Sequence, residues 1–250
     1  MRENKLRNLW ASGQTATNVW ATVPASYATE ILAHQGWDSI TVDTQHGVID
    51  YANMVAMLTA IATTPTVPLV RVGWNDPTQI MRAADAGAMG VICPTINNRQ
   101  ECEHFVGALR YPPLGYRSLG PNRARFLGED YALKANDTIL AIAQIETASG
   151  LEHVETIAAV KGLDMLYIGP SDLGLSLGRE GRMDQTDPVV VKAIDRILQV
   201  AKNAGLKAGI YCISPDYSKQ MRSKGFDLVT VASDVGLLAQ AGTALRRQFA

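Results

Sequence analysis

Short apolar, β-branched runs alternate along the whole chain with longer segments whose apolar residues recur at helical spacing. This alternation is typical of repeated βα units built around a parallel sheet. Runs such as ILAIAQI, DMLYI and DLVTV are almost continuously apolar, as strands covered on both faces are. The eight predicted strands are Asn18–Val23, Ser39–Asp43, Pro68–Val72, Gly90–Cys93, Ile139–Ile145, Met165–Ile168, Lys207–Tyr211 and Leu228–Val231. Eight such units predict an α/β fold, a (β/α)8 TIM barrel.

The length of the chain, 250 residues, is that of a single α/β barrel, which typically has about 250 residues. We therefore predict one domain over residues 1–250, with segments such as Ser26–Gln35 and Pro77–Ala86 as outer helices. The last predicted helix, Asp234–Phe249, is expected to close or extend the ring of helices, or to be exchanged between subunits. An open, doubly wound sheet is the structural alternative, but no GxGxxG turn follows the first strand.

One connection stands out by its length and composition. Residues Tyr111–Asn136 are rich in Pro, Gly and Arg and exceed a normal link from a helix to a strand. The segment is therefore predicted to be a functional loop rather than a linker between domains.

The charge of the chain is nearly balanced, with 23 Lys and Arg against 24 Asp and Glu. This gives no electrostatic reason to expect binding to nucleic acid, so small-molecule substrates are the predicted partners. No apolar run is long enough to span a membrane, and the first residues lack the apolar stretch of a signal peptide, which predicts a cytoplasmic protein. Cys93, Cys102 and Cys212 show no CxxC spacing and are interpreted as packing residues.

Polar side chains follow several predicted strands, at the end where a parallel barrel carries its active site. Asp43 and His46 follow the second strand in DTQHG, and Arg71 ends the third in PLVRVG. Glu146 ends the fifth strand in AQIET, and Asp172 follows the sixth in YIGPSDL. We expect these five side chains to meet on one rim.

Glu146 and Asp172 are the candidate metal ligands. A carboxylate placed directly after an apolar strand is costly to bury unless a cation compensates it. Two carboxylates leave most of an octahedral Mg²⁺ or Mn²⁺ shell open for water and a chelating substrate. The alternative is that both residues only cap helices or form salt bridges.

His46 lies in a glycine-containing loop just beyond Asp43. At that spacing a carboxylate can orient an imidazole and raise its basicity, which predicts a His–Asp dyad acting as a general base. Arg71, at the barrel mouth, is suited to bind a carboxylate or a developing enolate oxygen, with a buried ion pair as the alternative. The backbone N–H groups of the GPSDL turn suit an anionic group of the substrate.

In order and combination, the motifs of the chain resemble those of the HpcH/HpaI family, the metal-dependent class II pyruvate aldolases that act on hydroxy-oxo acids. The resemblance spans nearly the whole chain. It rests on Trp20, DxxHG at Asp43–Gly47, VRV around Arg71, ADAGAMGVICP, RYPPLGYRSLG, QIET, YIGPSDL and GFDLVTVASDVGLL.

This resemblance implies reversible addition of pyruvate, or of a hydroxypyruvate-like donor, to an aldehyde through a metal-bound enolate, giving a 4-hydroxy-2-oxo acid. Glu146 and Asp172 would hold Mg²⁺, Mn²⁺ or Co²⁺, with Gln144 beside the metal. His46, oriented by Asp43, would be the base, and Arg71 would contact the enolate oxygen. The other implied substrate-binding residues are Trp20, Gly169, Pro170 and Ser171.

The resemblance also implies a homo-oligomer, a hexamer built as a trimer of dimers. Asp85 and Arg117, together with Arg123 or Arg125, would then reach a neighbour's site. Gln45 and Ser118 stand where many family members have Glu and Gly, which leaves the acceptor aldehyde open.

Other chemistries fit the chain less well. A Schiff-base aldolase needs a desolvated lysine inside the barrel, but Lys207 begins its strand and the other lysines lie in loops or helices. A phosphate-handling barrel would favour Gly-rich loops after the last two strands, where this chain reads CISP and ASDV. The remaining alternatives are a related metal-dependent lyase, of the CoA-ester or phosphoenolpyruvate type, and a catalytically silent binding barrel.

Overall fold

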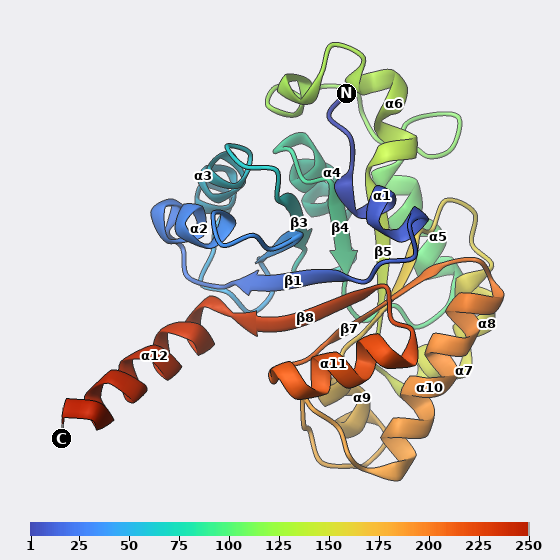
Figure 1. Ribbon diagram of the computed structural model, residues 1–250. Coiled ribbons are helices and arrows are strands. Elements are labelled where there is room, and N and C mark those ends of the chain that lie inside the picture. The colour runs from blue at the N-terminus through green and yellow to red at the C-terminus, as the bar shows by residue number, and fades with distance from the viewer. Residues whose placement is uncertain (250) are drawn as a thin grey trace.

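Eight parallel strands close into a barrel in the order of the sequence, with β8 hydrogen-bonded to β1 (Figure 1). The computed structural model describes residues 1–249. The strands are β1 (Ala16–Ala21), β2 (Ser39–Asp43), β3 (Val67–Arg71), β4 (Gly90–Cys93), β5 (Leu140–Ile145), β6 (Met165–Ile168), β7 (Lys207–Tyr211) and β8 (Leu228–Ser233). The predicted (β/α)8 barrel is confirmed. β1 lies two residues earlier than predicted, because its pairing with β8 begins at Ala16 opposite Leu228.

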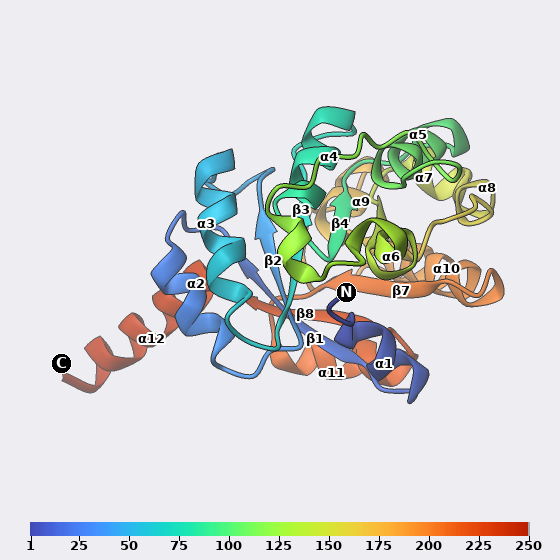
Figure 2. The same cartoon turned by 90° about the horizontal axis from the view of Figure 1, so that it is seen from above.

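Helices surround the barrel, and Figure 2 shows several of them arranged around the strands. Many begin with a side-chain cap: Asp50, Asp76, Asn98 and Asp187 each accept a backbone N–H of the helix that follows, an arrangement worth about 1 kcal/mol per cap. The helices are α1 (Lys5–Ala11), α2 (Ser26–Ala33), α3 (Tyr51–Ile61), α4 (Pro77–Asp85), α5 (Arg99–Leu109), the short 3₁₀ turn η1 (Ala124–Leu127), α6 (Tyr131–Thr138), α7 (Ala148–Glu152), α8 (Val154–Ala158), α9 (Pro170–Ser176), α10 (Pro188–Asn203), α11 (Pro215–Lys224) and α12 (Asp234–Phe249).

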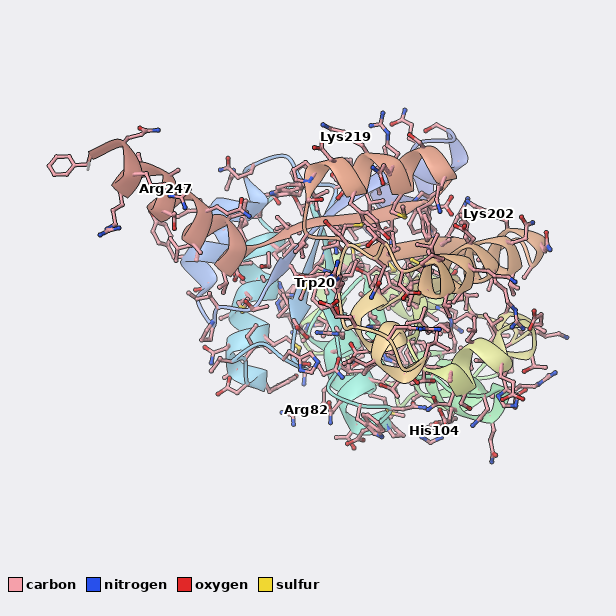
Figure 3. The ribbon with its side chains drawn as sticks, turned by 90° about the horizontal axis from the view of Figure 1, so that it is seen from below. Trp20, Arg82, His104, Lys202, Lys219 and Arg247 are labelled. Atoms are coloured by element: carbon pink, nitrogen blue, oxygen red, sulfur yellow. The ribbon has the colours of Figure 1, made fainter. Side chains whose placement is uncertain are left out.

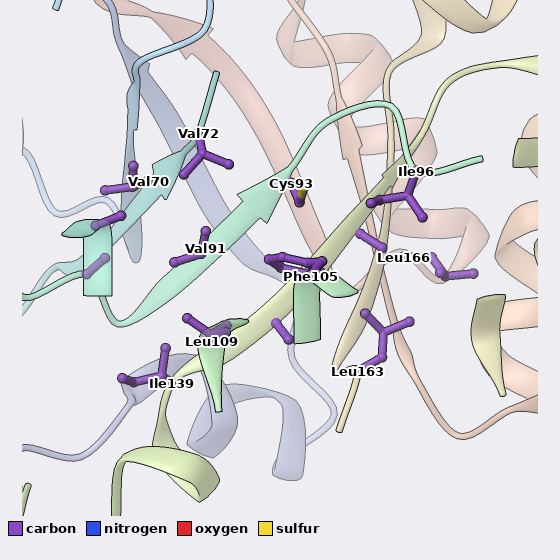
Figure 4. Packing of buried hydrophobic residues seen from close by; sticks show 14 of the residues in the cluster. Val70, Val72, Val91, Cys93, Ile96, Phe105, Leu109, Ile139, Leu163 and Leu166 are labelled. Atoms are coloured by element: carbon purple, nitrogen blue, oxygen red, sulfur yellow. The ribbon is translucent and has the colours of Figure 1, made fainter. Parts of the chain in front are cut away.

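The apolar residues form two cores. The larger one fills the space between the strands and the outer helices, as Figure 4 shows for Phe105 and Leu109 beside Val91. The smaller one includes Trp20 and Tyr167 from two of the strands and Leu6 from α1. The three cysteines are buried and free, as packing cysteines are. A helix long and apolar enough to cross a membrane is absent from residues 1–249.

The last helix leaves the barrel instead of closing it. α12 projects away from the body of the chain (Figure 1), and none of its residues is buried. Leu238, Leu245 and Phe249 on this helix are 74%, 67% and 96% exposed. The expectation that this helix closes or extends the ring is therefore wrong for the single chain, because within residues 1–249 only the start of the helix, at Leu237, packs against the core.

The long segment between α5 and β5 lies at the end of the barrel where the strands begin. Arg123 donates to the carbonyl oxygens of Leu58, in the last turn of α3, and of Ala86, which directly follows α4. Arg2 donates its backbone N–H to Leu127 O of the same segment. The segment thus ties neighbouring elements together, and within its own chain it does not border the rim where the strands end.

Candidate active site

A cavity of about 210 Å³ opens where the strands end. A second hollow adjoins it and shares His46 and Asp172 with it. The first is lined by Trp20, Thr22, Asp43, His46, Arg71, Gln144, Tyr167, Gly169, Pro170, Ser171, Asp172, Met183, Tyr211 and Ser233. The second brings in Gln45, Thr95 and Glu146. All five polar residues expected on one rim therefore line these two hollows.

Asp43 and Arg71 form a buried ion pair at the floor of the cavity. Arg71 Nε lies 2.9 Å from Asp43 Oδ1, and Nη2 lies 2.6 Å from Oδ2. The two residues are paired directly across β2 and β3 in the strand register. Such a two-pronged contact fixes the planar guanidinium at the barrel mouth.

This pair corrects the expected contact between Asp43 and His46. Asp43 Oδ1 accepts the backbone N–H of Gln45 at 3.0 Å and that of His46 at 3.4 Å, so Asp43 holds the loop and not the imidazole. The guanidinium already occupies both carboxylate oxygens. His46 itself is exposed and borders both hollows.

Aromatic side chains support the ion pair from inside the barrel. The guanidinium carbon of Arg71 lies 4.2 Å from the centre of the Trp20 ring, a cation–π distance. Trp20 packs edge-on against Tyr211, with ring centres 5.0 Å apart, and donates its indole N–H to Thr230 Oγ1 at 3.0 Å. Figure 3 shows Trp20 near the centre of the barrel. Trp20 thus orients the cation as well as lining the cavity.

The carboxylate of Glu146 is buried, and no basic side chain in residues 1–249 lies within salt-bridge distance of it. Its Oε1 accepts from Thr95 N at 2.9 Å and Thr95 Oγ1 at 3.0 Å, and its Oε2 accepts from Gln144 Nε2 at 2.5 Å. Burial, and next the negative charge of Asp172, raise the pKa of Glu146. Both causes disfavour the anion, and a bound cation would remove this cost.

The oxygen donors around Glu146 fit a hard divalent metal. Asp172 lies in the first turn of α9 and borders the same hollow as Glu146. Gln144 Oε1 is buried and finds no hydrogen-bond partner among the described residues. No group of three or more His, Cys, Asp or Glu within residues 1–249 is placed to hold a metal. A metal here would therefore depend on the two carboxylates, with water and substrate oxygens completing its shell.

Glycine at position 169 keeps this site open. A Cβ added to Gly169 would lie 2.4 Å from Glu146 Oε2 and 2.8 Å from Gln144 Nε2. Both the Glu146 carboxylate and the Gln144 amide would have to move. Gly169 is therefore needed for the close approach between the end of β6 and the two polar side chains that end β5.

The residues expected to reach a neighbouring subunit are mostly engaged in their own chain. The side chain of Arg117 is fully buried, and its Nη2 binds Asp85 Oδ1 at 2.6 Å. Arg123 binds Thr59 and two backbone carbonyls of the same chain. Both guanidinium groups are thus engaged within the single chain, and the contribution of Arg117 and Arg123 to a neighbouring subunit stays a prediction. Asp85 keeps a 28% exposed side chain, and its contribution to a neighbour stays a prediction.

Several lining residues were not singled out from the sequence. Tyr211 ends β7 and Ser233 ends β8, so their positions at strand ends were the available signal. Tyr167 faces the interior from β6, and Thr22 follows β1. Met183 lies in the connection between α9 and α10, where periodicity gives no clue to its direction.

Comparison of the sequence with known proteins gives a consistent result. The model of the family described as HpcH/HpaI aldolase/citrate lyase matches residues 17–241. A hydroxypyruvate/pyruvate aldolase of Rhizorhabdus wittichii is 38% identical over 239 residues, which are 95% of each chain. A 4-hydroxy-2-oxo-heptane-1,7-dioate aldolase of Shigella flexneri is 34% identical over 99% of this chain and 93% of its own.

Solved structures agree with the fold. An HpcH/HpaI aldolase/citrate lyase family protein from Burkholderia cenocepacia is 34% identical and superposes with a TM-score of 0.92, over 99% of this chain and 100% of that one. The citrate synthase SbnG is 28% identical with a TM-score of 0.86, over 97% of each chain.

Proposed function

This chain belongs to the HpcH/HpaI aldolase/citrate lyase family, and we propose that it catalyses the reversible addition of pyruvate or hydroxypyruvate to an aldehyde. The enzyme is an aldolase, a carbon–carbon lyase, and its products would be 4-hydroxy-2-oxo acids. The observation that carries the proposal is that a fixed cation, Arg71, and two carboxylates, Glu146 and Asp172, that form no salt bridge among the described residues border adjoining hollows.

The site is suited to stabilise an enolate. Removing a proton from the carbon next to a keto group places negative charge on the keto oxygen. Arg71, held by Asp43 and Trp20, presents a fixed positive charge to the cavity. A divalent metal bound at Glu146 and Asp172 would act as a Lewis acid that polarises the keto group. We favour Mg²⁺, Mn²⁺ or Co²⁺ because all the candidate protein ligands are oxygens.

His46 is the proposed acid–base residue. It is an exposed imidazole on the border between the two hollows. In the cleavage direction it would take the proton of the C4 hydroxyl, and in the addition direction it would return that proton. A flexible, solvated imidazole can exchange this proton with water between turnovers. Asp43 contributes by positioning Arg71 and the loop that carries His46.

The cavity suits a small donor that carries a carboxylate. Gly169 and the first residues of α9 line the same cavity as Arg71, and the free backbone N–H groups at the start of a helix suit a substrate carboxylate. Ser171 and Ser233 also line the cavity. Their hydroxyl groups can bind the hydroxymethyl group of hydroxypyruvate, and the methyl group of pyruvate fits the same space.

Exchange of the pyruvate methyl protons in D2O, followed by NMR, tests the proposal without knowledge of the acceptor. The protein would be stripped of metal and resupplied with Mg²⁺, Mn²⁺ or Co²⁺. Exchange that appears only with metal, and that is lost in Glu146→Gln, is the expected result. If none of the three metals supports exchange, the proposal of a pyruvate enolate is contradicted, and other oxo acids become the candidate substrates. Screening of aldehydes would then identify the acceptor.

The likeness to a citrate synthase supports a second candidate reaction on the same barrel. SbnG shares the fold and 28% of residues with this chain. Citrate synthesis forms a carbon–carbon bond at a more highly carboxylated substrate than pyruvate. Incubation with oxaloacetate and an acetyl thioester, with citrate measured by mass spectrometry, separates the two candidates, since an aldolase of pyruvate should give none.

We further propose that the chain acts as a homo-oligomer, with α12 packed on a second copy. The helix carries exposed apolar residues and has no buried residue in its own chain, and apolar surface of this kind is characteristic of subunit contacts. A hexamer is the state implied by the family. Light scattering of the full chain and of a chain ending at residue 238 tests this, since the truncated chain should lose subunits, and an unchanged mass would contradict the role of α12.

A further inference from the structure

Thr95 adopts an uncommon backbone conformation directly beside Glu146. Its φ of 55° is in the left-handed region, and it is the one residue other than glycine with a positive φ in residues 1–249. Thr is β-branched, and such residues are outliers in this region. A strained residue of this kind persists only where surrounding contacts hold it, and it often marks a functional site.

The conformation aims two donors of Thr95 at one atom. The backbone N–H and the hydroxyl both donate to Glu146 Oε1, at 2.9 and 3.0 Å. Gln144 binds the other carboxylate oxygen. The carboxylate of Glu146 is therefore held from two sides, and its plane is set before any ligand arrives.

The loop that carries Thr95 has other anchors. Ile96 N donates to Gln144 O at 3.1 Å, and Thr147 Oγ1 donates to Asn97 Oδ1 at 2.5 Å. Asn97 N and Asn97 Nδ2 also bind Glu101. Because these contacts do not involve the Thr95 side chain, loss of its hydroxyl should leave the loop in place.

We propose that Thr95 is a positioning residue that orients the Glu146 carboxylate toward a divalent metal and thereby strengthens binding of that metal. The proposal rests on the proposed function, in which Glu146 is a metal ligand. Hydrogen bonds to the ligating carboxylate are a general means of tuning a metal site, and their loss typically weakens metal affinity by about 10- to 100-fold. The hydroxyl of Thr95 supplies one of two such bonds to Oε1, so the lower end of this range is expected.

Binding of Mn²⁺ to the metal-free protein, followed by electron paramagnetic resonance, is the test. Thr95→Val keeps the branched shape and removes the hydroxyl, and should weaken Mn²⁺ binding by roughly 10-fold. Thr95→Gly removes the hydroxyl but relieves the backbone strain, so it folds readily and should show a similar loss. Thr95→Ser keeps the hydroxyl and should restore affinity to within about 3-fold of the wild type, by the same reasoning. Thr156→Val, at an exposed position on α8, is the matched control.

The outcomes separate the two proposals. If the wild type binds Mn²⁺ and Glu146→Gln does not, but Thr95→Val and Thr95→Gly bind as the wild type does, the role of Thr95 is overturned while the metal site stands. If the wild type does not bind Mn²⁺, the metal site of the proposed function is overturned, and the role of Thr95 with it. A loss in Thr95→Val and Thr95→Gly that Thr95→Ser repairs supports the proposal, because a merely structural effect of the side chain would not follow the hydroxyl.

Discussion

Arg71 binds both carboxylate oxygens of Asp43 across neighbouring strands, at 2.9 and 2.6 Å. The two residues are direct partners in the register of β2 and β3, and both are buried. This pair places a fixed positive charge at the cavity floor. The roles of the two residues are therefore coupled, and each should contribute little to catalysis when the other is removed.

Asp43→Asn removes the charge that holds Arg71, and we expect kcat to fall by roughly 100-fold, as misplacement of a catalytic group can cause. Arg71→Met should cause a loss at least as large. The double variant should lose much less than the product of the two single effects, because both act through one unit. Steady-state kinetics on the three variants gives the answer, and fully multiplicative losses would show that the residues act independently. Thermal unfolding of each variant serves as the control for folding.

His46→Ala should lower kcat by roughly 100- to 10,000-fold, the usual contribution of a general acid–base group. The side chain is exposed, so the melting temperature should hardly change. His34→Ala is the matched control, because His34 is an exposed histidine at the end of α2, outside both hollows. Cleavage of a 4-hydroxy-2-oxo acid, coupled to pyruvate detection, measures the effect. Wild-type turnover in His46→Ala would rule out its proposed role.

The raised pKa of Glu146, caused by burial and by Asp172, makes the stability of the metal-free protein depend on pH. A carboxyl whose folded-state pKa is raised contributes stability that is complete below its unfolded pKa and is lost as the pH rises through its folded pKa. On going from about pH 5 to pH 8, the metal-free wild type should therefore lose stability relative to Glu146→Gln. Urea unfolding at both pH values, with and without Mn²⁺, checks this. Metal should reverse the loss in the wild type alone, and parallel behaviour of the two proteins would argue against the effect.

Gly169→Ala should reduce metal affinity and activity together, since the new Cβ would lie 2.4 Å from Glu146 Oε2. The carboxylate would have to turn away from its bond with Gln144. Thermal unfolding of Gly169→Ala serves as the control for folding. Mn²⁺ titration and aldol cleavage are the two measurements. Unimpaired Mn²⁺ binding in Gly169→Ala would mean that the carboxylate has room that the structure does not show.

Much of the architecture follows from the sequence alone. Strand segments such as Ser39–Asp43 and Met165–Ile168 were predicted with their observed bounds, because apolar runs between helical patterns are local signals. The rim residues were also identifiable, since a parallel barrel places every strand's carboxyl end on one face. His46, Glu146 and Asp172 lie within four residues of their strand ends and could be assigned to that face without coordinates.

Only the tertiary structure decided which of these side chains bind one another. The pairing of β2 with β3 puts Asp43 beside Arg71, whereas proximity in sequence had suggested His46. Arg117 lies buried against Asp85, 32 positions away in the sequence. Such a contact depends on how whole elements pack together. The strained Thr95 and the space at Gly169 are likewise invisible in the sequence. Local periodicity determines which segments form strands and helices, but side-chain partners are set by register and packing between segments far apart in the chain.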